Sequence, residues 1–129
     1  LVTEWLARQP ERGNRPLGYF GASTGAAAAL AASTITSTPI AAIVSRGGRP
    51  DLAGDALERV MAPTLLIVGG ADDRVIDLNK DAARRLRCHH AVTIVPGATH
   101  LFEEPGALDA VAALAADWYV THLAHPTAA

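Results

Sequence analysis

Residues 18–30, GYFGASTGAAAAL, decide how the fold is interpreted, because a serine stands between two glycines where an apolar run gives way to alanines. The apolar residues up to Ala22 indicate a buried strand, and residues 24–32 indicate a helix, since alanine is the best helix former. A Gly-x-Ser-x-Gly turn between a strand and a helix is the pattern of a nucleophile elbow. The alternative is an ordinary glycine-rich turn, and the downstream residues must decide between the two.

Three further apolar runs, IAAIVS at 40–45, TLLIVGG at 64–70 and AVTIVPG at 91–97, alternate with helical patterns. The order is a helix end at residues 1–8 and then four repeats of strand and helix. Short, wholly apolar strands that alternate with helices favour a parallel sheet covered on both faces. We therefore expect an α/β fold with about four parallel strands and helices on both faces, in a single domain over residues 1–129.

The helical segments carry more detailed expectations. The turn-forming residues STITSTP at 33–39 should end the alanine-rich helix. Asp51 should cap a helix that runs to Val60, and Asp77 should cap a later one. The last helix should run to about Leu123, with an apolar stripe formed by Leu108, Val111, Ala115 and Trp118.

Composition excludes several classes of function. The 129 residues carry a net charge of −2 without a clustered basic run, which gives no electrostatic case for binding nucleic acid. No apolar run approaches the roughly 20 residues that cross a bilayer. The single cysteine excludes an internal disulfide and fits a cytoplasmic protein. The aspartates at 72, 73 and 77 lack the Ca²⁺-loop pattern, so we assign no metal and no cofactor.

In a parallel sheet the carboxyl ends of all strands lie at the same end of the sheet, and ligands bind there. The residues just past three of the strands are Ser23, Asp72 with its neighbour Asp73, and His100. A serine hydroxyl needs a base to become a nucleophile, imidazole titrates near neutrality, and a carboxylate can orient the imidazole. We predict Ser23, Asp72 and His100 as a catalytic triad, with Asp73 as the rival acid. The other four histidines are expected at the surface.

Neighbouring groups complete the predicted site. The amide of Thr24, at the start of the helix, can donate to an oxyanion. Side chains at positions 21 and 25 would collide with neighbouring elements, which explains the two glycines. Arg46 and Arg49, in the loop RGGRP, could bind a substrate carboxylate or phosphate. A structural role for these arginines, paired with Asp51 or Asp55, is the alternative.

These motifs together resemble the α/β-hydrolase family, in particular its dienelactone-hydrolase-like branch. The resemblance extends over GYFGASTG, VSRGGRPDLAGDAL, APTLLIVGGADDRVIDLN and VPGATHLFEEPGAL. It implies that Ser23 is the nucleophile, Asp72 the acid and His100 the base of a hydrolase that cleaves an ester or related acyl bond through an acyl-enzyme. Dienelactone hydrolases proper have cysteine at the elbow, so Ser23 favours esterase-like chemistry.

The resemblance also implies about four strands before the first one here, and a second oxyanion donor after the third of them. We therefore expect the carboxyl-terminal half of a hydrolase domain, a truncated α/β-hydrolase fold. The first strand would have an open edge, which favours self-association or pairing with an amino-terminal segment.

Two other classes of function remain open. Glycines between a strand and a helix also cradle phosphates, but GASTGAAAAL has no lysine before a Ser or Thr as a phosphate loop requires. The other class is a catalytically inactive half-domain that serves association or is fused to another enzyme. Some members of this branch look like modules behind a phosphoribosyltransferase domain, which makes a fusion partner plausible.

Overall fold

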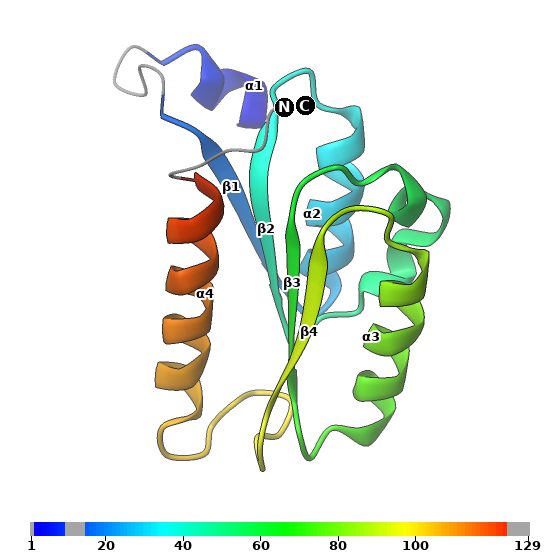
Figure 1. The fold of residues 1–129 in the computed structure, drawn as a ribbon, viewed down its shortest axis with the longest axis vertical. Coiled ribbons are helices and arrows are strands. Elements are labelled where there is room, and N and C mark those ends of the chain that lie inside the picture. The colour runs from blue at the N-terminus through cyan, green and yellow to red at the C-terminus, as the bar shows by residue number, and fades with distance from the viewer. Residues whose placement is uncertain (1, 10–14, 124–129) are drawn as a thin grey trace.

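The computed structural model describes residues 2–9 and 15–123 (Figure 1). The elements in chain order are α1 (Val2–Ala7), β1 (Leu17–Ala22), α2 (Thr24–Ile35), β2 (Ile40–Arg46), η2 (Pro50–Arg59), β3 (Thr64–Gly69), α3 (Asp73–Arg85), β4 (His90–Val95) and α4 (Ala107–Leu123). The expected α/β class is therefore confirmed. Within these residues, no helix combines the length and the hydropathy that a membrane span requires.

The four strands form one parallel sheet in the order β1-β2-β3-β4. All four carboxyl ends point toward the lower part of Figure 1. In the described chain β1 pairs with β2 alone, so one edge of β1 has no strand beside it. The central strand β3 is buried at all six positions, as expected for a strand covered on both faces.

Each face of the sheet carries its own apolar core. The helices α2, η2 and α3 cover one face, and α4 covers the other (Figure 1). Alternate side chains of a strand point to opposite faces, so Ile43 and Leu66 pack under α2, η2 and α3, while Val44 and Ile67 pack under α4. The prediction of helices on both faces is confirmed.

Two helices differ from the sequence-based expectation. α2 continues to Ile35, beyond the predicted break, because the hydroxyls of Ser33 and Thr34 donate to carbonyls three residues back and fit the helix. The segment after β2 is a 3₁₀ helix interrupted at Gly54, where φ is 58°. Asp51 does not cap this helix, because the helix begins at Pro50 and the Asp51 carboxylate pairs with Arg49 instead.

Two further expectations, for Asp77 and Leu108, are wrong in position. Asp77 lies inside α3 and cannot cap it, since the helix begins at Asp73. Leu108 is 53% exposed, because the stripe of α4 that faces the sheet starts one residue earlier, at buried Ala107. Helical periodicity gives the spacing of an apolar stripe. The residue at which the stripe starts depends on how the preceding loop orients the helix against the sheet.

Candidate active site

Ser23 occupies a strained turn between β1 and α2. Its φ of 50° and ψ of −125° lie outside the helix and strand regions, which is uncommon for a residue with a side chain. Its carbonyl accepts hydrogen bonds from the Ala26 amide at 3.2 Å and the Arg49 amide at 3.0 Å. These two bonds fix the backbone conformation that places the Ser23 side chain at the tip of the turn.

Gly21 is required by close packing in this turn. A Cβ at Gly21 would lie 2.6 Å from the Ala26 Cα atom and from the Gly25 carbonyl oxygen. Gly25 is different, because a Cβ there would meet no atom of the described residues within 4 Å beyond its own helix and chain neighbours. The prediction that both glycines avoid collisions is therefore wrong for Gly25, whose position in the first turn of α2 faces open space.

Asp72 immediately precedes α3, and the turn that carries it is bonded to the turn after β4. The Ala71 amide donates to the Ala98 carbonyl at 3.0 Å, and the Gly70 amide donates to the Val95 carbonyl at 2.8 Å. A Cβ at Gly69 would lie only 2.3 Å from the Ala98 oxygen, so this close approach of two turns requires glycine. The acid and histidine turns thus form one bonded unit.

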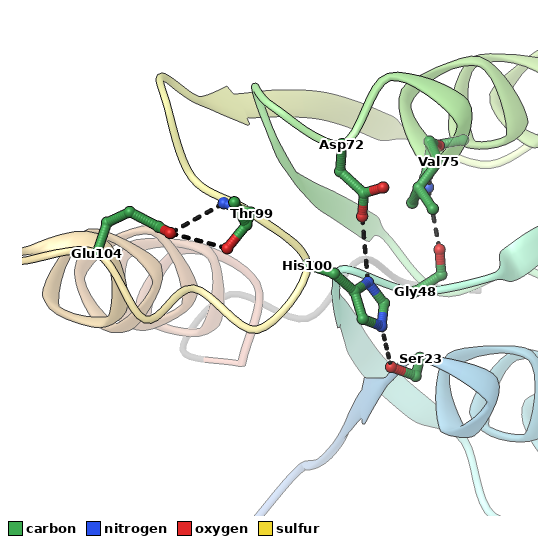
Figure 2. Close-up of polar contacts among 8 residues, drawn as sticks. Ser23, Gly48, Asp72, Val75, Thr99, His100 and Glu104 are labelled. Carbon is green, nitrogen blue, oxygen red and sulfur yellow. Dashed lines mark hydrogen bonds and ion pairs between the residues drawn. The ribbon is translucent and has the colours of Figure 1, made fainter.

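His100 lies in the turn after β4, and Glu104 clamps that turn. The Glu104 carboxylate accepts hydrogen bonds from the Thr99 amide at 2.9 Å and the Thr99 hydroxyl at 2.8 Å (Figure 2). These bonds lower the pKa of Glu104 below its ordinary value, because they stabilise the ionised form. Our sequence analysis missed Glu104, although a glutamate five residues after a threonine in a predicted loop was an available signal.

The structure brings Ser23, Asp72 and His100 together (Figure 2). His100 Nε2 lies 2.9 Å from Ser23 Oγ, and His100 Nδ1 lies 3.1 Å from Asp72 Oδ2. An ionised carboxylate can only accept, so in the neutral imidazole Nδ1 carries the proton and Nε2 accepts from the serine hydroxyl. Asp73 makes no such contact and is exposed at the start of α3. The arrangement is suited to withdrawing the Ser23 proton.

The side chains that contact one another here are partly exposed to solvent, as an accessible nucleophile requires. The His100 side chain is 43% exposed and that of Asp72 is 19% exposed. Thr24 is the first residue of α2, and the first amides of a helix have no partner within it. The Thr24 amide is therefore placed beside Ser23 as a possible oxyanion donor.

The two arginines of the following loop have different surroundings. Arg49 forms a two-pronged ion pair with Asp51, at 3.0 Å and 2.9 Å, which raises the pKa of Arg49. Arg46 has no ion pair among the described residues, and its Nε is buried without a hydrogen-bond partner there. The Arg46 guanidinium lies over the Phe102 ring, 5.5 Å from its centroid.

The remaining candidates lie elsewhere. His89 stacks on Trp118 at 5.4 Å between ring centroids, near His122, at the opposite end of the sheet from Ser23. His125 lies outside the described residues. Burial raises the pKa of the Cys88 thiol, which disfavours a thiolate nucleophile. Within the described chain, no three His, Cys, Asp or Glu side chains gather as a metal site.

Comparison with solved structures extends these observations. The dienelactone hydrolase of Anabaena variabilis is 53% identical, with a TM-score of 0.92 over 95% of this chain and 56% of its own. A dienelactone hydrolase-like promiscuous phosphotriesterase from metagenomic libraries shares the fold at 23% identity and a TM-score of 0.62, over 89% of this chain and 57% of its own.

The chain has the fold of part of a dienelactone-hydrolase-like α/β hydrolase. It is truncated relative to the Anabaena hydrolase, as its coverage of 56% of that chain shows. No family model matches the sequence. Proteins from two strains of Mycobacterium tuberculosis, which carry the provisional name phosphoribosyl transferase, are 58% identical over 125 residues. The matched region covers 97% of this chain but only 28% of the length of each of these relatives.

The two glycines of the elbow provide a matched test of the local geometry. Gly21→Ala should destabilise the fold by about 1–3 kcal/mol, because its Cβ would press on the α2 backbone. Gly25→Ala should be neutral or stabilise by up to about 1 kcal/mol, because alanine is the better helix former and the space is open. Urea denaturation of both variants measures this difference, and equal losses would contradict the described packing.

Proposed function

We propose that the chain carries the triad of a serine hydrolase that cleaves a carboxylic ester or related acyl bond. The observation that carries the proposal is the continuous path of hydrogen bonds from Ser23 Oγ through His100 to Asp72. The hydrolase fold of the neighbours supports it. The family resemblance alone would not, since one fold hosts many functions.

In the proposed reaction His100 Nε2 takes the Ser23 hydroxyl proton as Oγ attacks the carbonyl carbon. The Asp72 carboxylate holds the Nδ1 proton and stabilises the imidazolium. Collapse of the tetrahedral intermediate expels the alcohol, which takes the proton from His100. Water, activated by the same imidazole, then hydrolyses the acyl-Ser23 ester and releases the acid.

The oxyanion would be held by the Thr24 amide at the positive end of α2. A second donor is implied by the family resemblance, and we propose that it comes from a segment beyond this chain. Losing one such donor typically lowers turnover by roughly 10²–10³-fold. The relatives in Mycobacterium are several times longer than the chain. An inactive half-domain that serves association or a fused transferase is therefore the alternative function.

Replacing Asp72 and Asp73 in turn tests which aspartate is the acid of the proposed triad. Asp72→Asn should reduce kcat for p-nitrophenyl acetate by roughly 10³–10⁴-fold, because the amide cannot hold the productive imidazole tautomer. Asp73→Asn is the matched control and should leave kcat nearly unchanged, since Asp73 does not contact His100. Steady-state kinetics of the two variants measures this, and an equal loss in both would refute the assignment of the acid.

Arg46 is proposed to select substrates with an anionic group. It is the Cα partner of Ala22, the residue before Ser23, and its guanidinium is not neutralised by a carboxylate of the described chain. Arg49, in contrast, already has Asp51 as its partner. The substrate-binding hypothesis is therefore retained for Arg46, and Arg49 is given the structural role.

Replacing Arg46 should change specificity more than turnover. Arg46→Ala should lower the ratio of kcat/KM for an anionic ester to that for a neutral ester by roughly 10–100-fold, because a charge-assisted contact is lost. The exposed Arg59→Ala is the control. If the ratio were the same in Arg46→Ala and the native protein, the specificity role would be wrong.

We also propose that the open edge of β1 pairs with another strand, either from a second copy or from an amino-terminal segment. Beside this edge Phe20 is 53% exposed, on the face that α4 covers only in part. An unpaired edge next to an exposed aromatic side chain favours association.

Light scattering tests the edge proposal. The 129-residue chain should give a mass well above its 13.4 kDa. Phe20→Lys should shift the mass toward that of the monomer, because a charged side chain disfavours pairing at the edge. Val120→Lys, at an exposed position of α4, is the control and should associate as the native chain does. A native chain that is a stable monomer would contradict pairing of this edge with a second copy.

A further inference from the structure

The loop after β2, residues 47–49, contacts two of the turns that form the proposed triad. The Arg49 amide donates to the Ser23 carbonyl at 3.0 Å. Gly47 packs so closely on the histidine turn that a Cβ there would lie 3.1 Å from the His100 carbonyl oxygen. The Gly47 amide donates to the Ile67 carbonyl of β3 at 2.8 Å. The position of this loop therefore bears on both Ser23 and His100.

Asn79 joins this loop to α3. Its Nδ2 group donates to the Gly48 carbonyl at 3.1 Å and to the Val75 carbonyl, one turn back, at 2.8 Å (the contact at Gly48 is drawn in Figure 2). Both partners can only accept, so the orientation of the amide is fixed. Asn79 is completely buried, and α3 begins directly after Asp72. The helix α3 therefore directly follows Asp72, the proposed acid. Through Asn79 it is also bonded to the loop whose Arg49 amide donates to the Ser23 carbonyl.

A purely packing role does not account for an asparagine at this position. The Asn79 Oδ1 atom is buried and has no hydrogen-bond partner among the described residues. Leaving a buried acceptor unpaired is unfavourable, and an apolar side chain would fill space without that cost. What the amide supplies is the donor to Gly48, which no aliphatic side chain can replace.

We infer that Asn79 is a positioning residue, which acts through Gly48 and the Arg49 amide to hold Ser23 in register with Asp72 and His100. The inference rests on the proposed function. The strained backbone of Ser23 must be held by its surroundings. The Arg49 amide is one of the two groups that hold its carbonyl. A shift of the loop away from α3 would move Ser23 Oγ relative to His100 Nε2.

Two variants test this inference. Asn79→Ser keeps a short donor that can bond back to the preceding turn of α3, as Ser33 does in α2, but it cannot reach Gly48. We expect kcat for p-nitrophenyl acetate, and the rate of fluorophosphonate labelling, to fall at least 10-fold. KM should stay close to native. The melting temperature should fall moderately, because the Gly48 carbonyl loses its partner and the smaller side chain leaves a cavity, but the variant should still fold.

Asn79→Asp adds a readout that loss of packing would not give. Its ionised carboxylate would face two carbonyl oxygens, whereas the protonated carboxyl could donate to Gly48. The ratio of the variant to the native labelling rate should therefore rise as the pH falls, and dividing by the native rate removes pH effects that the two proteins share. Ser45→Ala is the control, because it removes a buried hydroxyl that lies beside the same loop and has no hydrogen-bond partner among the described residues. This variant should be labelled at the native rate.

The outcomes separate this inference from the proposed function. Absence of labelling in the native protein would refute the hydrolase proposal itself. Native labelling together with unchanged rates in both Asn79 variants would overturn the positioning role alone. Failure of both variants to fold would also overturn it, because Asn79 would then serve the stability of the fold rather than the placement of Ser23.

Discussion

The hydrogen bond between Ser23 Oγ and His100 Nε2 joins residues 77 positions apart, and the proposed function depends on it. No local sequence preference can create such a contact. The contact follows from the parallel sheet, in which the carboxyl ends of β1, β3 and β4 lie at the same end of the sheet (Figure 1). Every residue of the interior strand β3 is buried, and helices pack on both of its faces.

Backbone hydrogen bonds between the turns refine the positions that the sheet sets approximately. Gly70 and Ala71 donate to the histidine turn, and Arg49 donates to the elbow. Such bonds matter because hydrogen-bond geometry tolerates only a few tenths of an ångström before proton transfer suffers. The glycines at 21 and 69 are needed where these backbones approach most closely. The scaffold around the proposed triad is therefore made largely of main-chain contacts.

The sequence predicted the parts of this arrangement that depend on chain order and pattern. The apolar runs located four strands, and the motif spacing singled out the three side chains that the structure brings together. Contacts set by tertiary packing were missed. Gly25 and Gly21 look equivalent in sequence, yet only Gly21 faces another backbone atom. Asn79 stands three residues before buried Ala82, so a polar residue on the inner face of a helix was the available signal.

If the imidazole of His100 makes Ser23 a nucleophile, a fluorophosphonate should form a covalent adduct at Ser23 that depends on His100. The protein would be treated with a fluorophosphonate, digested and analysed by mass spectrometry, beside its His100→Ala variant. We expect a single phosphonyl group on the peptide that contains Ser23, and its loss in the variant, because a serine without its base is unreactive. An unmodified Ser23, or equal modification without His100, would show that His100 does not activate Ser23.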